Sequence, residues 1–172
     1  MAGIREHYDI LLSEVYTWLF GGFIEAKKRN AEFFKNKNIL PRLSGEAIDL
    51  GAGSGFQSIP LAEIGFSVTA IDLNELLLQE LSYNAQGLNV SVVQDDIMNF
   101  QNYSDSNVEL IVCMTETIIH LESKKNVIDL FNKLFQSLEK DGKFILTFRD
   151  LTYELKGLDR FIPVKSNENT IF

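Results

Sequence analysis

The feature that most constrains this chain is a glycine-rich loop that follows a short apolar run. Residues 47–50 read Ala-Ile-Asp-Leu, and Gly51, Gly53 and Gly55 then alternate with small residues before Phe56. Glycine at alternate positions lets the backbone turn tightly and approach a ligand without interference from a Cβ atom. A helix that begins near Phe56 would point its free N–H groups at the same place. The loop therefore predicts a strand, turn and helix that bind a polar or anionic ligand, the alternative being an ordinary turn without one.

Short apolar runs alternate with amphipathic stretches on both sides of this loop. We expect strands at 47–50, 67–72, 90–94, 109–114 and 143–148, and helices at 56–64, 74–86 and 124–138. Strands that read as nearly continuous apolar runs are typical of a parallel sheet buried on both faces. Right-handed crossovers leave a three-layer, doubly wound α/β sandwich as the simplest topology. Its ligand site should lie at the carboxyl ends of the strands.

The segment before the first strand differs from the rest. Aromatic residues recur there at helical spacing, and Gly21-Gly22 should separate one helix over about 4–19 from another over about 23–37. We expect a single domain over residues 1–172. Within it, residues 1–45 differ in composition from residues 46–150, where the alternating pattern runs, and residues 151–172 follow the last expected strand.

Charge and cysteine content exclude several classes of function. The chain has 16 Lys and Arg against 24 Asp and Glu, a formal net charge of -8, which repels nucleic acid and anionic membranes. The single Cys113 cannot form an intramolecular disulfide, and with only His7 and His120 it cannot complete a zinc site. Because we also find no membrane span and no signal peptide pattern, we expect a cytoplasmic protein with no metal, nucleic-acid or membrane partner.

An acidic residue stands at the interval at which dinucleotide-binding domains bind ribose. Asp72 follows Gly51 by 21 residues, so its carboxylate could accept bonds from two ribose hydroxyls. The alternative is an acid that stabilises the dipole of the helix expected over 74–86. Phe56 stands where the dinucleotide fingerprint has its third glycine, which disfavours a nicotinamide oxidoreductase.

Three ordered motifs, residues 47–55, 68–73 and 92–97, resemble those of the class I S-adenosylmethionine-dependent methyltransferases. The resemblance implies a Rossmann-like fold with strand order 3-2-1-4-5, S-adenosylmethionine (SAM) as cofactor and S-adenosylhomocysteine as product. In that family the chain continues with a helix and an antiparallel strand pair. Only 24 residues follow Phe148, so we expect this pair to be missing or incomplete.

The resemblance also implies which residues hold the methionine and ribose parts of the cofactor. By position in the motifs, Asp49, Gly51, Gly53 and Gly55 would hold the methionine part, and Asp72 would bind the ribose.

The adenine end is assigned in the same way. Asp96 aligns best with the acid that reaches the adenine amino group, and Asp95 is the alternative register. Ile97 or Leu73 could wall the adenine or simply belong to the core. The resemblance further implies that residues 1–45 form a helical lid or cap, 46–150 the cofactor-binding core, and 151–172 an incomplete C-terminal extension. Tyr16 is our candidate from the lid.

The segment after the fourth strand carries the candidate catalytic residues. Methyl transfer from a sulfonium is an in-line displacement with an activated donor, so the protein mainly positions the acceptor. Glu116 and His120 could act as bases, or each could serve only in capping or packing. The segment lacks the Asn or Asp followed by Pro-Pro and an aromatic that is typical of methylation of DNA bases, glutamine or RNA adenine. Cys113 lies within an apolar run, which predicts inert burial.

These observations favour an enzyme that methylates a small molecule. The alternative is a non-catalytic SAM-binding subunit or a fragment of a larger methyltransferase. The last expected strand would form an open sheet edge, so we also expect residues 151–172, or a second subunit in a homodimer, to cover it.

Overall fold

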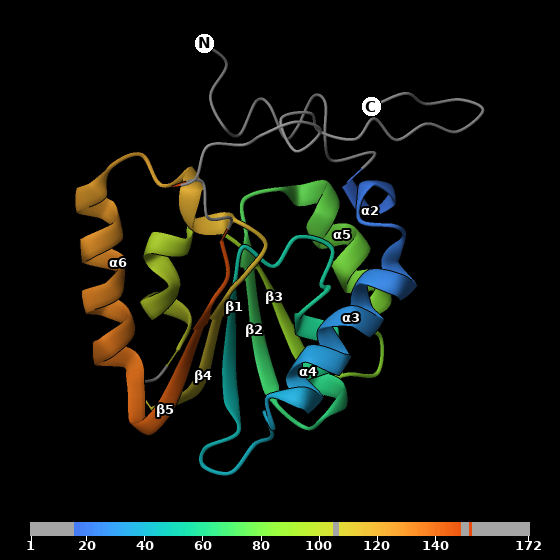
Figure 1. Ribbon diagram of the computed structural model, residues 1–172, viewed down its shortest axis with the longest axis horizontal. Coiled ribbons are helices and arrows are strands. Elements are labelled where there is room, and N and C mark those ends of the chain that lie inside the picture. Colours follow the sequence, from blue (N-terminus) through green and yellow to red (C-terminus); the bar gives the residue numbers. More distant parts are fainter. Residues whose placement is uncertain (1–15, 105–106, 149–151, 153–172) are drawn as a thin grey trace.

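The computed structural model describes residues 16–104, 107–148 and 152, which form an α/β structure of three layers (Figure 1). Its centre is a five-stranded sheet in the order β3-β2-β1-β4-β5, in which every neighbouring pair is parallel. The strands are β1 (Glu46–Leu50), β2 (Ser67–Asp72), β3 (Val90–Gln94), β4 (Val108–Cys113) and β5 (Leu138–Leu146). The predicted fold class and strand order are confirmed.

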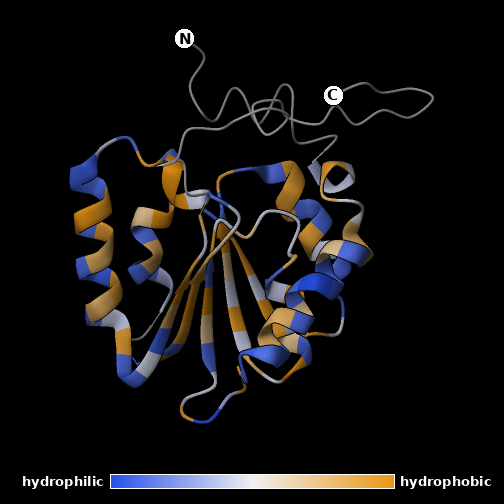
Figure 2. Cartoon of the chain, in the orientation of Figure 1, coloured by the Kyte–Doolittle hydropathy of each residue, from blue (hydrophilic) through white to orange (hydrophobic). Residues whose placement is uncertain are grey.

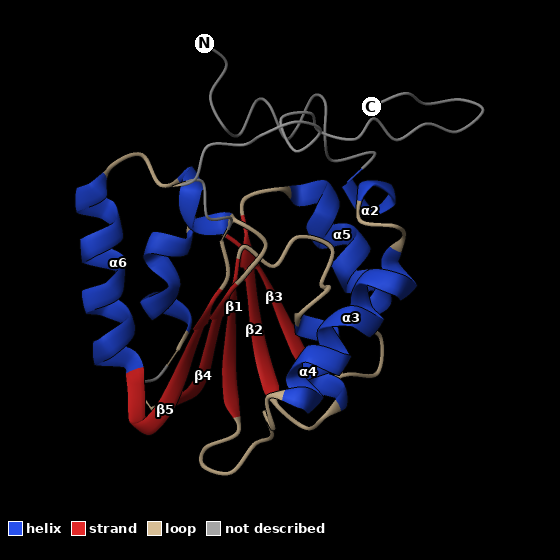
Figure 3. Cartoon of the chain, in the orientation of Figure 1, coloured by secondary structure: helices blue, strands red, loops and turns tan. Residues whose placement is uncertain are grey.

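Helices cover both faces of the sheet (Figure 3). One face carries α3 (Phe23–Asn36), α4 (Ser58–Glu63) and α5 (Glu75–Asn84), and the other carries α6 (Lys124–Ser137) and the 3-10 helix η2 (Ile97–Tyr103). Two short elements lie near the carboxyl ends of the strands, α2 (Tyr16–Leu19) and the 3-10 helix η3 (Thr117–His120). Among the described helices, none has both the length and the apolar character needed to cross a lipid bilayer.

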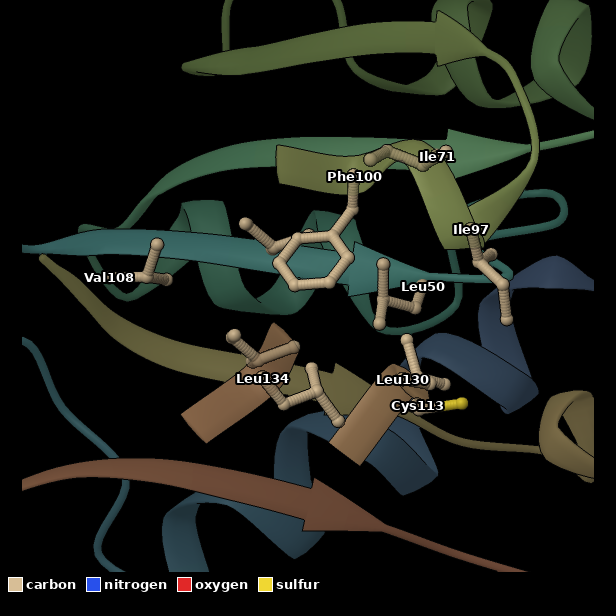
Figure 4. Packing of buried hydrophobic residues seen from close by; sticks show 10 residues of the cluster. Leu50, Ile71, Ile97, Phe100, Val108, Cys113, Leu130 and Leu134 are labelled. Atoms are coloured by element: carbon tan, nitrogen blue, oxygen red, sulfur yellow. The ribbon is translucent and has the colours of Figure 1, made fainter. Parts of the chain in front are cut away.

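The core forms because successive strand residues point to opposite faces of the sheet. On one face, Leu50 and Ile71 pack against Phe100 of η2 and against Leu130 and Leu134 of α6 (Figure 4). A second cluster fills the opposite face beneath α3 and α4. Every residue of β4 is buried, as predicted for a central strand covered on both sides. Hydrophilic and hydrophobic residues alternate along α6 (Figure 2).

Local sequence signals set the helix ends. Gly21 and Gly22 have positive φ and separate α2 from α3, which confirms the predicted break. The side chain of Asn74 accepts a hydrogen bond from the backbone N–H of Leu77 at the start of α5. Ser123 caps α6 in the same way.

The structure differs from the predicted elements at β5. This strand begins at Leu138, directly after α6, whereas the sequence predicts a start near residue 143. Polar residues and a positive φ at Asp141 make residues 139–142 resemble a turn, and the pairing with β4 is irregular there. Most of the helix predicted over 4–19, and the extension 151–172 apart from Thr152, lie outside the described residues. Coverage of the β5 edge therefore stays a prediction.

Candidate functional site

A cavity of about 440 Å³ opens at the carboxyl ends of β1, β2 and β4. Its volume falls within the range of small-molecule and cofactor sites. The residues of its wall that the sequence predicts are Tyr16, Gly51, Gly53, Asp72, Leu73, Asp96, Ile97 and His120. The other residues of the wall are Asn74, Leu77, Met98, Thr115, Thr117, Leu121, Glu122 and Asn126. No motif in the sequence indicates these residues, although Thr115 directly follows the strand predicted over 109–114 and Thr117 comes two residues later.

The glycine loop forms the floor of the cavity. Gly51 has φ of 77°, and a Cβ atom at this position would overlap the side chain of Thr117. Glycine is therefore required here both by the backbone conformation and by the close approach of η3. Gly55 serves packing instead, because a Cβ atom there would lie 2.8 Å from Cγ of Leu81 in α5. Gly55 does not belong to the cavity wall, in contrast to Gly51 and Gly53.

Asp49 lies beneath this loop and is 1% exposed. One of its carboxylate oxygens, Oδ2, accepts a hydrogen bond of 2.6 Å from the hydroxyl of Ser58. The other oxygen, Oδ1, is buried without a hydrogen-bond partner among the described residues. Burial raises the pKa of Asp49 to about 7, the bond from Ser58 opposes this rise, and the charge of Asp72 adds to it. A buried acceptor in this position would be stabilised by a donor, above all by a cationic one.

Asp72 links the glycine loop to the start of α5. Its Oδ2 accepts from the backbone N–H of Gly53 at 2.8 Å, and its Oδ1 accepts from the backbone N–H of Asn74 at 2.9 Å. Burial raises the pKa of Asp72, while the bonds from Asn74, Gly53 and Leu73 and the charge of His120 act in the opposite direction. Each carboxylate oxygen can accept more than one bond, so both remain able to accept from hydroxyl groups.

The structure separates the two acids after β3. Asp96 lies in the cavity wall and accepts from the backbone N–H of Met98 at 2.8 Å. Asp95 lies outside that wall, where it accepts bonds from the hydroxyl of Tyr103 at 2.7 Å and from the side chain of Asn99 at 2.9 Å. These bonds lower the pKa of Asp95. The geometry favours the register that uses Asp96.

The two candidate bases also take different positions. His120 lies in the cavity wall, which it shares with Asp72. Glu116 precedes η3 as its N-cap residue, has φ of 69° and does not belong to the wall. Thr115 has φ of 59°, which is costly for a β-branched residue. Such strain is common where a loop is held in place for binding or catalysis.

Hydrogen bonds hold this strained loop from two sides. The backbone N–H of Thr115 donates to Oγ1 of Thr147 at 3.0 Å, and the buried Gln57 donates to Oγ1 of Thr115 at 3.0 Å. Nearby, burial raises the pKa of Cys113 to about 12, so the thiol stays protonated at neutral pH.

Tyr16 closes the cavity from the N-terminal side. Its ring stacks on Phe56 with centroids 5.7 Å apart and an interplanar angle of 8°. A Cβ atom at Gly53 would lie 3.3 Å from Cε1 of Tyr16, so the aromatic ring lies directly over the loop.

A glycine loop after the central strand, with acids after the next two strands, defines a Rossmann-like domain of the type that binds nucleoside-containing cofactors. Residues 47–142 match the family described as methyltransferase domain. The chain belongs to the methyltransferase domain family and has the class I fold.

Known proteins agree with this assignment. YqeM of Bacillus subtilis strain 168, which is named as a methyltransferase, is 33% identical over 144 residues, covering 81% of this chain and 51% of YqeM. Ubiquinone biosynthesis O-methyltransferase of Rickettsia conorii is 31% identical over 119 residues, covering 68% of this chain and 38% of that protein. The chain thus spans about half the length of YqeM and less of the Rickettsia enzyme.

A solved structure shows the same fold. Magnesium protoporphyrin IX methyltransferase ChlM from Synechocystis PCC 6803, determined with bound SAM, has a TM-score of 0.65 at 17% identity. The superposition covers 98% of this chain and 91% of ChlM.

Proposed function

We propose that the chain binds SAM in the cavity at the carboxyl ends of β1, β2 and β4 and transfers its methyl group to a small-molecule acceptor. The observation that carries the proposal is the meeting of the glycine loop, Asp72 and Asp96 in the wall of one cavity. Membership of the methyltransferase domain family supports it. So does the SAM bound to ChlM, which has the same fold.

The residues present fit the chemical groups of SAM. Asp49 lies two residues before Gly51 and outside the cavity wall, and its buried oxygen that has no described donor suits the positive charge of an amino-acid ammonium group. Gly51 and Gly53 present loop backbone in the cavity wall. Asp72 retains acceptor capacity for ribose hydroxyls, and Asp96 can accept from an exocyclic amine.

Apolar surface and covering elements complete this site. Ile97 and Leu73 would supply apolar walls for the adenine ring. Tyr16 and η3 approach the glycine loop from two sides and would limit access of water. Among the described residues of the predicted lid, Tyr16 lies in the cavity wall, whereas α3 packs on a face of the sheet.

When bound, SAM supplies a methyl group already activated by a sulfonium sulfur. The chain then has to hold an acceptor in line with that group and, for an acceptor with a proton to lose, remove the proton. His120 is our first choice for that base because it lies in the cavity wall, and Glu116 is the second. Thr115 and Thr117 add hydroxyl groups that could orient an acceptor.

A transfer assay with isotope-labelled SAM tests the proposal. The full chain is incubated with a panel of small phenols, amines and carboxylic acids, and label in the acceptor is measured. Asp72→Ala should reduce transfer at least about tenfold by weakening SAM binding, whereas Asp129→Asn on α6, away from the cavity, should match the unmodified chain. SAM binding without transfer to any acceptor would favour the non-catalytic subunit, and absence of SAM binding would contradict the proposal.

A further inference from the structure

Three side-chain oxygens from separate elements meet beside the glycine loop. Oγ1 of Thr17 in α2 donates to Oε2 of Glu80 in α5 at 2.7 Å. Oγ of Ser54 in the loop donates to the same carboxylate oxygen at 2.8 Å. The two hydroxyl oxygens lie 2.8 Å from each other. One carboxylate of α5 therefore binds both the lid segment and the loop.

Partial burial strengthens these hydrogen bonds. Ser54 is fully buried, and Thr17 and Glu80 are half-buried, so water competes only partly for the three groups. Hydrogen bonds from hydroxyl groups to an ionised carboxylate are stronger than bonds between neutral groups. Because the two donors come from different elements, each bond restricts the position of one element relative to α5.

The helix α2 is a single turn of four residues, and none of its residues is buried. Its contacts with the rest of the fold include the ring of Tyr16 on Phe56 and the hydroxyl of Thr17. Phe20, which directly follows α2, also packs its ring on Phe56. Tyr16, the neighbour of Thr17, is the residue that lies over Gly53 in the cavity wall.

We propose that Thr17, Ser54 and Glu80 form a positioning cluster that holds α2 and Tyr16 against the glycine loop and so raises the affinity of the site for SAM. The identity of the ligand, SAM, rests on the proposed function. The effect of the cluster on the position of α2 does not depend on that function. The cluster acts through Tyr16 and the loop and needs no contact with the cofactor itself.

A matched pair of variants at Thr17 tests the cluster. Thr17→Val removes the hydroxyl and keeps the volume of the side chain, whereas Thr17→Ser keeps the hydroxyl. Calorimetric titration with SAM should show about tenfold weaker binding for Thr17→Val and binding within about twofold of the unmodified chain for Thr17→Ser. Equal SAM affinities for the two variants would overturn the proposal.

A double-mutant cycle separates positioning of Tyr16 from a general loss of stability. If the cluster acts through Tyr16, Thr17→Val should have little further effect on SAM affinity once Tyr16→Ala is present. Additive losses from Tyr16→Ala and Thr17→Val would show that the hydroxyl acts independently of the ring, contrary to the proposal.

A measurement made without SAM tests the positioning of α2 separately from the proposed function. Trp18 is the single tryptophan of the chain and follows Thr17 in α2, so its fluorescence reports the environment of that helix. Quenching by acrylamide should increase in Thr17→Val and Glu80→Ala, but not in Thr17→Ser or in Gln79→Ala, the neighbouring control on α5. Unchanged quenching in both disrupting variants would overturn the inference even if SAM binds. Increased quenching in a chain that binds no SAM would support the positioning of α2 and reject the proposed function.

Discussion

Asp49 carries a buried carboxylate whose ionisation we expect to lower stability and to favour a cationic ligand. Among the described residues, Ser58 alone donates to its two oxygens, and burial raises the pKa of Asp49 to about 7. At pH 8 the folded protein must therefore hold an ionised carboxylate that is only partly hydrogen-bonded. A cationic group of a ligand would compensate that charge.

Replacement of Asp49 should therefore change stability and binding in opposite directions. Asp49→Asn removes the buried charge, so we expect the free energy of unfolding at pH 8 to rise by about 2–4 kcal/mol in the absence of ligand. SAM affinity should fall at least about tenfold. Urea denaturation and calorimetric titration measure the two effects. A variant that is destabilised at pH 8, or that binds SAM as before, would contradict this role.

The same residue predicts a pH dependence of stability. Between its ordinary pKa of 3.8 and about 7, Asp49 holds a proton in the folded state that the unfolded state has lost. Unfolding then releases a proton, so the stabilising contribution of protonated Asp49 is lost as pH rises through about 7. We expect the difference in unfolding free energy between Asp49→Asn and the unmodified chain to be small near pH 4 and to grow up to pH 8. A difference independent of pH would exclude Asp49 as its source.

Residue patterns indicated the floor of the site and the cover residue Tyr16, but not the approach of Thr117. The glycines and Asp72 follow fixed intervals along the chain, because a strand, a turn and a helix repeat in βαβ units. The position of Thr117 over Gly51 depends instead on positive φ values at Thr115 and Glu116. Tertiary contacts impose that conformation, and no periodicity in the sequence encodes it.

At the scale of elements, the connection that leads into β1 depends on a buried acid in β4. Glu109 is 7% exposed, and its carboxylate accepts from the backbone N–H groups of Arg42, Leu43 and Gly45 at 2.7 to 2.9 Å. Burial alone would raise the pKa of Glu109, but these three bonds, helped by the charge of Lys143, lower it. The carboxylate thereby anchors the segment between α3 and the sheet.

Glu109→Gln should destabilise this connection. The amide keeps one acceptor oxygen but turns an NH₂ group toward backbone donors, so we expect a loss of about 1–3 kcal/mol at pH 7 in chemical denaturation. Because the folded pKa is lowered, the contribution of ionised Glu109 is present above its ordinary pKa and disappears as pH falls through the folded value. The loss should therefore shrink in acid. Glu46→Gln, an exposed change at the start of β1, is the control, and an equal effect of both variants would refute the anchor.

Strands buried on both faces of the sheet could be predicted from the sequence, whereas a strand that contains polar residues could not be predicted in full. The uninterrupted apolar run of β4 indicated a central strand, and all of its residues are buried. The first half of β5 was not predicted because Glu139, Lys140 and Asp141 are polar and interrupt the apolar pattern of a strand. Pairing with β4 holds this part of the chain in the sheet. The 3-10 helix η2 was missed because single buried residues, such as Phe100, give it no clear period.

At the scale of the whole molecule, topology explains why the site lies where it does. In a sheet of order β3-β2-β1-β4-β5, the chain leaves β1 for β2 on one side and returns to β4 on the other. The loops that follow β1 and β4 therefore diverge and leave room between them at the carboxyl ends of the strands. The sequence predicts this switch point. The acceptor depends on the shape of the cavity and on side chains such as Thr115, which the motifs do not specify.

The most direct test of the account is calorimetric titration of the full chain with SAM and S-adenosylhomocysteine, with NAD as the control. We predict saturable binding of both at one site, with dissociation constants on the order of micromolar, and no binding of NAD. Binding of NAD in place of SAM, or of none of the three, would contradict the central claim that the glycine loop, Asp72 and Asp96 form a SAM site.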